Sequence, residues 1–159
     1  MEPSAASERL RVRLLGLGNE LLADDAFGLL VAERAATWFP GLEVARSSEA
    51  GLALLDHFMG ASRLIIVDTL QTGKFAPGTL RLLGSAELQA PPGGSLHGAG
   101  LWEAWQLARH LGFGAPDEVF IVAVEPADCS TVGGRMHPDV EAAIPEALRR
   151  IGALLEGSR

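Results

Sequence analysis

The sequence predicts an α/β fold, a three-layer sandwich in which helices cover both faces of a mostly parallel, five-stranded sheet. Short apolar, β-branched segments alternate along the chain with longer segments whose apolar residues recur every three or four positions, a pattern typical of parallel sheets. The 159 residues, 48% of them hydrophobic, suffice for one such core. No change in composition marks a boundary, so we expect a single domain over 1–159 with a frayed start at 1–9.

Five segments have the composition of strands. They cover 11–17, 42–47, 63–68, 79–83 and 117–124. The first and third are apolar enough to be buried on both faces of a sheet. Segment 79–83 alternates only weakly, which predicts an edge strand and is compatible with an antiparallel orientation.

The periodic segments between the strands predict helices with one buried face each. The expected buried residues are Phe27, Leu30 or Val31, Ala35 and Trp38; Leu52, Leu55 and Phe58 or Met59; Leu101, Ala104 or Trp105, Ala108 and Leu111; and Val140, Ile144, Leu148, Ile151 and Leu155. Pro145 interrupts the last stripe. Because an interior proline costs about 3 kcal/mol, we expect a break or a fresh helix start there.

The overall charge excludes several classes of partner. With 13 Lys and Arg against 20 Asp and Glu, the net charge of −7 gives no basic surface for nucleic acid or an anionic membrane. No apolar stretch approaches the roughly 20 residues that cross a bilayer, so we expect a cytoplasmic protein. Cys129 is the only cysteine, which excludes an internal disulfide and multi-cysteine metal sites. Any metal must be bound by oxygen and imidazole ligands.

Familiar nucleotide and hydrolase motifs are absent. The segment from Gly16 to Asn19 resembles the start of a dinucleotide fingerprint, but Leu21 stands where the third glycine is required. The sequence contains no phosphate-binding P-loop, no His-Glu-x-x-His and no Gly-x-Ser-x-Gly. A lone thiol without a placed histidine is typically inert, so we do not expect Cys129 to be a nucleophile.

Acidic residues and a histidine follow the predicted strands. Ligands in such sheets bind at the carboxyl ends of the strands, so we expect the loop from Gly16 to Asp25, with positive φ at Gly16 or Gly18, to share one edge with Asp68 and Glu125. The loop that carries His97 and Pro91–Gly94, which we expect to be mobile, can reach this edge. Asp25, Asp68 and His97 form an oxygen and nitrogen set suited to a divalent transition metal.

Each of these residues also has an ordinary structural explanation. Asp25 could cap a helix, Asp68 could accept amide hydrogen bonds from its own loop, and His97 could be solvated beside a helix start. Of the adjacent acids, we interpret Asp24 as the structural cap and Asp25 as the ligand.

Several ordered motifs closely resemble the [NiFe]-hydrogenase maturation endopeptidases over about residues 12–155. They are Gly-Leu-Gly-Asn-Glu-Leu-Leu-Ala-Asp-Asp-Ala-Phe-Gly from position 16, Leu-Ile-Ile-Val-Asp-Thr-Leu-Gln-Thr-Gly from 64, Pro-Gly-Thr-Leu from 77, Ser-Leu-His-Gly from 95 and Val-Ala-Val-Glu-Pro from 122. The resemblance implies the same α/β sandwich. It also implies an endopeptidase that removes a C-terminal extension from a hydrogenase large-subunit precursor after nickel insertion.

By this resemblance, Asp25, Asp68 and His97 contact the nickel and form the catalytic set. The nickel is the substrate's own, so the free enzyme need not hold a metal. We assign Gly18, Asn19 and Glu49 to substrate binding and expect a monomer.

Two departures from the family pattern stand out. Ala26 replaces a frequent glycine, and Arg46-Ser-Ser-Glu49 replaces a frequent Asp-Gly-Gly-Thr; we interpret the second as a shift of hydrogenase subclass. Two alternatives to cleavage remain open: a non-catalytic binder that checks nickel loading, and a small-molecule hydrolase or phosphorylase on a related sandwich.

Overall fold

A computed structural model describes residues 10–89 and 100–157. The start at 1–9, the loop at Pro91–Gly94 and His97 lie outside the described residues. The elements run in the order β1 (Val12–Leu17), the 3-10 helix η1 (Ala23–Ala26), α1 (Phe27–Trp38), β2 (Glu43–Ser47), the 3-10 helix η2 (Gly51–Leu54), α2 (Leu55–Phe58), β3 (Arg63–Thr69), β4 (Leu80–Leu83), α3 (Ser85–Leu88), α4 (Leu101–Leu111), β5 (Glu118–Val124), α5 (Pro138–Ala142) and α6 (Ile144–Glu156).

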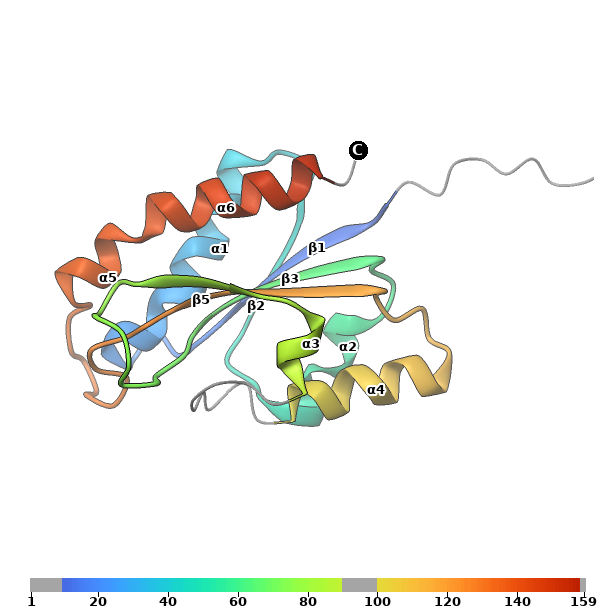
Figure 1. The fold of residues 1–159 in the computed structure, drawn as a ribbon, viewed down its shortest axis with the longest axis horizontal. Helices are drawn as coiled ribbons and strands as arrows, with labels where there is room; N and C mark the ends of the chain where they lie inside the picture. The colour runs from blue at the N-terminus through green and yellow to red at the C-terminus, as the bar shows by residue number, and fades with distance from the viewer. Residues whose placement is uncertain (1–9, 90–99, 158–159) are drawn as a thin grey trace, which may run out of the picture.

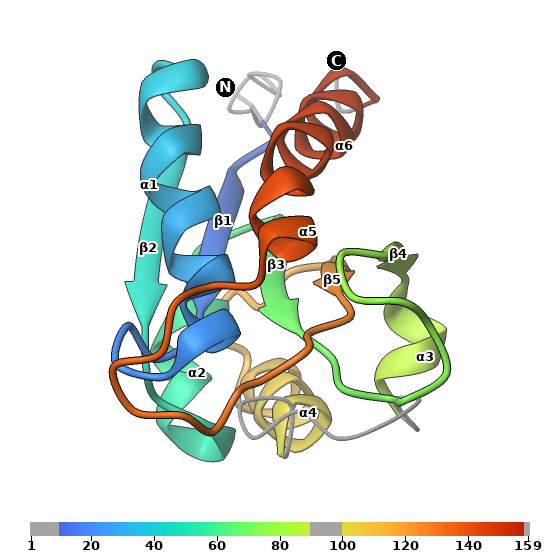
Figure 2. The same ribbon diagram turned by 90° about the vertical axis from the view of Figure 1, so that its left-hand side faces the viewer.

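The strands form one five-stranded sheet in the order β2-β1-β3-β5-β4. β2, β1, β3 and β5 are parallel, and β4 pairs antiparallel with β5 at the edge. The expected edge strand at 79–83 is therefore confirmed. β2 forms the opposite edge, beside β1 (Figure 2). Because β1 and β3 lie between other strands, their apolar residues are buried on both faces.

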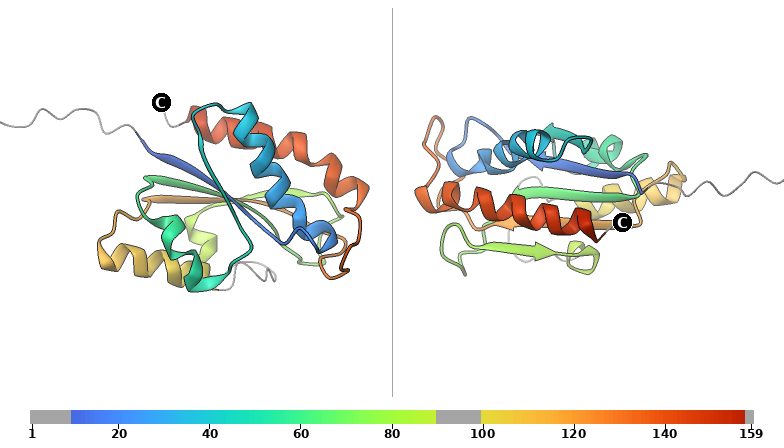
Figure 3. Two further views of the ribbon diagram at one scale, coloured as in Figure 1. Left: turned by 180° about the vertical axis from the view of Figure 1, so that it is seen from behind. Right: turned by 90° about the horizontal axis from the view of Figure 1, so that it is seen from above.

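Helices cover both faces of the sheet, as predicted. α1, α5 and α6 lie on one face and α2, α3 and α4 on the other (Figures 1 and 3). The first core packs α1 and α6 against the sheet around Phe27, Ile65 and Ile144. The second packs α2 and α4 against the opposite face around Phe58, Ile66 and Trp105.

The C-terminal helix begins afresh near Pro145, as expected. α5 ends at Ala142 and α6 starts at Ile144, so the proline lies in the first turn, where no intrahelical N–H is required. Within the described residues, no helix has the length and apolar character needed to cross a membrane.

Three residues that the helical pattern predicted to be buried are exposed. Leu111, the last residue of α4, is 44% exposed, because it lies at the end of its helix. Trp38 is the last residue of α1 and is 58% exposed, because it lies at the end of the helix. Leu52 is 59% exposed, and Leu54 is buried in its place. The segment starts as a 3-10 helix with three residues per turn, which moves the inward-facing positions.

Candidate functional site

The carboxyl edge of the sheet gathers the buried polar residues of the described chain. Their exposed fractions are 0% for Asp24, 3% for Asp25, 4% for Asp68, 4% for Thr69 and 2% for Glu125. They come from η1, the end of β3 and the residue after β5, as the rule for parallel sheets predicted. Burying four carboxylates requires that each be compensated by donors or cations. Their hydrogen bonds divide them into two groups.

Glycines bring the start of α1 against the sheet. A Cβ on Gly16 would lie 2.3 Å from the carbonyl oxygen of Gly28, and a Cβ on Gly28 would lie 2.2 Å from that of Leu17. Gly18, whose φ is 157°, leaves no room for a Cβ beside the carbonyl of Asp25. Gly16 does not take the positive φ considered for it. Its role is close approach, which holds Asp25 at the sheet edge.

Asp24 is structural, but it does not cap its own helix. Its Oδ2 accepts the backbone N–H of Ala127 at 2.7 Å and of Asp128 at 2.9 Å, and its Oδ1 accepts that of His137 at 2.6 Å. No side chain caps η1. The prediction that Asp24 caps its own helix is therefore wrong. Its carboxylate instead binds the β5–α5 loop and connects this loop to η1; the two segments pass each other in Figure 2.

Glu125 is the second structural carboxylate. Its Oε1 accepts the N–H of Thr72 at 2.9 Å and of Gly73 at 2.7 Å, and its Oε2 accepts the Thr72 hydroxyl at 2.8 Å. These bonds fix the loop that follows β3 against the end of β5. Asp24 and Glu125 thus each satisfy a buried charge with three donors from a neighbouring loop.

Asp25 and Asp68 meet at Thr69. The Thr69 hydroxyl donates to Asp25 Oδ1 at 3.1 Å, and the Thr69 N–H donates to Asp68 Oδ1 at 2.8 Å. One residue therefore orients both carboxylates that the sequence nominated as ligands. Two buried carboxylates that accept hydrogen bonds from one residue have the chemistry of oxygen ligands for a cation.

Cys129 lies next to this pair. Its Sγ–H donates to the Thr69 hydroxyl oxygen at 3.6 Å. Burial raises the pKa of the Cys129 thiol to about 12, and the negative charges of Asp25, Asp24 and Asp68 act in the same direction. A thiol with so raised a pKa is a poor nucleophile at neutral pH, which agrees with the expectation from sequence.

The structure brings together two of the three predicted ligands. His97, the third, lies outside the described residues. Within 10–89 and 100–157, no three His, Cys, Asp or Glu side chains form a group that could hold a metal. As carboxylates, Asp25 and Asp68 offer oxygen atoms only, so the predicted metal site would have to be completed by another segment or by the substrate.

A depression of about 620 Å³ lies at the carboxyl ends of β1 and β2. It is lined by Asn19, Glu20, Leu21, Leu29, Arg46, Ser47 and Ser48. Of the residues assigned to substrate binding, Asn19 lines this depression. The Gly18 N–H is bonded to the Ser47 carbonyl at 3.1 Å, and the Glu49 N–H to the Ser47 hydroxyl at 3.0 Å. The Asn19 side-chain oxygen accepts the Leu21 N–H at 3.0 Å.

Among residues 10–89 and 100–157 no strand pairs with the outer edge of β2, and this edge continues the depression. Since the Ser47 carbonyl points toward Gly18 and β1, the alternation of a strand directs the backbone N–H and C=O of Val44 and Arg46 away from the sheet. A smaller depression of about 240 Å³ is lined by Val44 and Arg46 together with Ala32, Glu33 and Ala36 of α1. Arg46 belongs to both depressions, so they adjoin along this edge.

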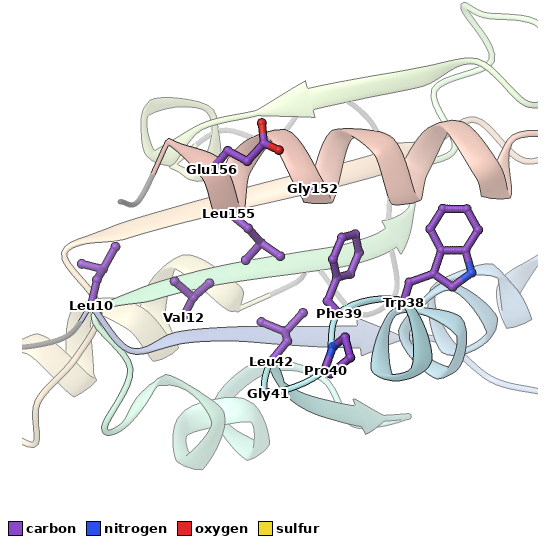
Figure 4. Close-up of a pocket in the computed structure, with 10 residues that line it drawn as sticks. All are labelled: Leu10, Val12, Trp38, Phe39, Pro40, Gly41, Leu42, Gly152, Leu155 and Glu156. Atoms are coloured by element: carbon purple, nitrogen blue, oxygen red, sulfur yellow. The ribbon is translucent and has the colours of Figure 1, made fainter.

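Another depression, of about 450 Å³, lies at the opposite pole. Figure 4 shows its lining residues, which come from the start of β1, the end of α1 and the last turns of α6. The exposed Trp38 stands at its rim. This depression is remote from the buried carboxylates and contains none of the predicted site residues.

Sequence reasoning missed the roles of Thr69 and Glu125. Thr69 directly follows Asp68 at the end of an obvious strand, so its position was a usable signal. The donors to Asp24 lie 103 to 113 residues away in the chain, and no spacing rule could have indicated them.

Comparison with known proteins gives a consistent result. The family model described as hydrogenase maturation protease matches residues 41–153. The Hydrogenase 2 maturation protease of Escherichia coli K12 is 31% identical over 154 residues, which cover 94% of this chain and 93% of that protein. The hydrogenase expression/formation protein HupM of Azotobacter chroococcum is 34% identical over 145 residues, 86% of this chain and 68% of that protein.

The fold agrees with solved structures. The hydrogenase maturating endopeptidase HybD from E. coli superimposes with a TM-score of 0.80 at 32% identity, over 93% of each chain. The [NiFe] hydrogenase maturation protease HybD from Thermococcus kodakarensis, at 23% identity and a TM-score of 0.73 over 91% of this chain and 98% of that one, shares the fold. The match of the family model over most of the sequence, together with these relatives, means that the chain belongs to the hydrogenase maturation protease family.

Proposed function

We propose that this protein is the endopeptidase that removes the C-terminal extension of a [NiFe]-hydrogenase large-subunit precursor, and that it acts once nickel has been inserted. Membership of the hydrogenase maturation protease family supports the class of reaction. The proposed role of nickel is supported by one observation: the buried carboxylates of Asp25 and Asp68 both accept hydrogen bonds from Thr69.

Asp25 and Asp68 are the proposed contacts to the nickel of the precursor, with His97 as the third. Carboxylate and imidazole ligands suit a divalent transition metal, and a site with few protein ligands leaves positions for those of the substrate. The nickel is then part of the substrate, and its presence reports that the precursor is loaded. Asp25 and Asp68 would act as ligands or as a base, and nickel held there would supply polarisation of the scissile carbonyl or activation of a water molecule.

The free edge of β2 is the proposed docking strip for an extended segment of the precursor. Val44 and Arg46 direct backbone donors and acceptors outward, which is the arrangement that an added strand uses. The strip adjoins the depression that Asn19 lines, and that depression lies at the same sheet edge as Asp25 and Asp68. A segment paired with β2 therefore leads toward the carboxylates.

The deciding experiment is cleavage of purified precursor. Nickel-loaded large-subunit precursor should become shorter on incubation with the protein, whereas nickel-free precursor should stay intact. Asp25→Asn and His97→Ala should prevent the cut. Binding of loaded precursor without any cleavage would favour the non-catalytic checkpoint. Cleavage of nickel-free precursor at the same rate as loaded precursor would show that the protein does not recognise nickel.

Arg46→Pro tests the docking strip, with Arg46→Ala as the matched control. Proline removes one outward N–H at an exposed edge position and leaves the bonds to β1 intact. The loss of one hydrogen bond to the substrate predicts a rise in KM of about 5- to 10-fold for the proline variant alone. Both variants lose the exposed pair of Arg46 with Glu33, so equal KM values would reject the added strand.

A further inference from the structure

Thr69 is the buried polar residue that donates hydrogen bonds to both Asp25 and Asp68. It is 4% exposed and lies at the last position of β3, between the two carboxylates. Its backbone N–H serves Asp68 and its side-chain hydroxyl serves Asp25. The N–H contact survives any substitution other than proline, whereas the hydroxyl contact depends on the side chain.

The direction of each hydrogen bond follows from the chemistry of the partners. A hydroxyl has one proton and two lone pairs, and an ionised carboxylate only accepts. The Thr69 proton must therefore point to Asp25 Oδ1, and the hydroxyl oxygen is left to accept a bond. Cys129 Sγ, 3.6 Å away, supplies the donor. Cys129 therefore donates to Thr69, and Thr69 in turn donates to Asp25.

A threonine holds this arrangement more firmly than a serine. Its β-branch restricts rotation about χ1, and its methyl group is enclosed with the rest of the side chain in the buried end of β3. The Thr69 hydroxyl is thus held toward Asp25 in one preferred χ1 rotamer. Residues that orient ligands by such outer contacts commonly affect metal affinity or activity by about 10- to 100-fold.

We propose that Thr69 is a positioning residue for the reaction: its hydroxyl, itself oriented by the Cys129 thiol, fixes the Asp25 carboxylate in register with Asp68 so that both face one cation. This inference rests on the proposed function for the identity of that cation as nickel. In this role Thr69 acts through Asp25 and Asp68, the two carboxylates to which it donates hydrogen bonds.

The test compares Thr69→Val with Thr69→Ser. Valine keeps the shape of the side chain and removes the hydroxyl, whereas serine keeps the hydroxyl and removes the methyl group. For the valine variant we expect kcat for loaded precursor and affinity for Ni²⁺ alone, measured by calorimetric titration, to fall about 10- to 100-fold. The serine variant should stay within about 3-fold of the wild type in both measurements.

A Cys129→Ala variant tests the hydrogen bond from the Cys129 thiol to the Thr69 hydroxyl. Because a thiol is a weak donor, its loss should reduce kcat less than the loss of the Thr69 hydroxyl. Thermal unfolding of all three variants checks that the fold is retained, and retention of Ni²⁺ affinity in the serine variant but not in the valine variant distinguishes positioning from general loosening.

Two results would overturn the proposal: a valine variant with wild-type kcat, or a serine variant as impaired as the valine variant, since the latter would assign the effect to methyl packing. Failure of the wild-type protein to cut loaded precursor would be a different result. It would refute the proposed function, while the order of Ni²⁺ affinities among the variants would still test the positioning role.

Discussion

Asp24→Asn separates the two adjacent acids of η1 by their roles. Asp24 is fully buried and accepts three backbone N–H groups, two on Oδ2 and one on Oδ1. An asparagine oxygen in place of Oδ2 still accepts the N–H groups of Ala127 and Asp128, but as a neutral acceptor in place of a charged one. Its amide nitrogen, in place of Oδ1, then faces the N–H of His137, donor against donor.

The magnitude follows from these three bonds. A buried donor left without an acceptor costs about 1–3 kcal/mol, and each change from a charged to a neutral acceptor costs about 1 kcal/mol. The expected decrease in the free energy of unfolding is about 3–5 kcal/mol. For a chain of this length, that corresponds to a Tm lower by about 6–20 °C.

Urea unfolding, followed by circular dichroism and by the fluorescence of the three tryptophans, measures this loss. Asp25→Asn is the matched control, because an asparagine oxygen still accepts the Thr69 hydroxyl bond that Asp25 Oδ1 accepts. We expect it to lose less stability than Asp24→Asn and to abolish cleavage.

An Asp24→Asn variant that unfolds within about 1 kcal/mol of the wild type would show that the three short bonds contribute little. A reversal, in which Asp24→Asn is stable but inactive and Asp25→Asn is unstable but active, would exchange the roles of the two acids.

Three further predictions concern packing and titration. Gly28→Ala should cost at least about 3 kcal/mol, because its Cβ would lie 2.2 and 2.4 Å from carbonyl oxygens of β1 and β3; Gly152→Ala, whose Cβ comes no closer than 3.4 Å to another atom, is the control, and equal urea midpoints would contradict the close approach. Burial raises the pKa of Cys129 to about 12, so its native alkylation by iodoacetamide at pH 8 should be about 10²- to 10³-fold slower than in urea; because the unfolded thiol loses its proton first, stability should also fall as the pH rises above about 9. Hydrogen bonds from Thr131 and Ser130 lower the pKa of Asp128, so its contribution to stability is present above about pH 4 and is lost as the pH falls through the lowered value. The stability difference between wild type and Asp128→Asn should shrink on acidification, and a difference independent of pH would argue against the role of these bonds.

Much of the fold was predictable because its signals are local. The apolar run of β3, the weak alternation of β4 and the proline at position 145 each constrain their own segment, and the structure agrees in all three cases. Local patterns failed where the geometry of an element changes. The 3-10 start of η2 buries Leu54 rather than Leu52, and the end of α1 leaves Trp38 exposed.

The sequence by itself determined the α/β architecture, the edge at which polar residues gather, and the nomination of Asp25 and Asp68. These follow from periodicity, from the chirality of strand–helix–strand units and from the position of each acid after an apolar segment. Only the tertiary structure decided what each carboxylate does. The donors to Asp24 come from a loop more than 100 residues away, and the Thr69 hydroxyl reaches Asp25 across 44 residues. Such bonds depend on the packing of loops against one another, which leaves no periodic trace in the sequence.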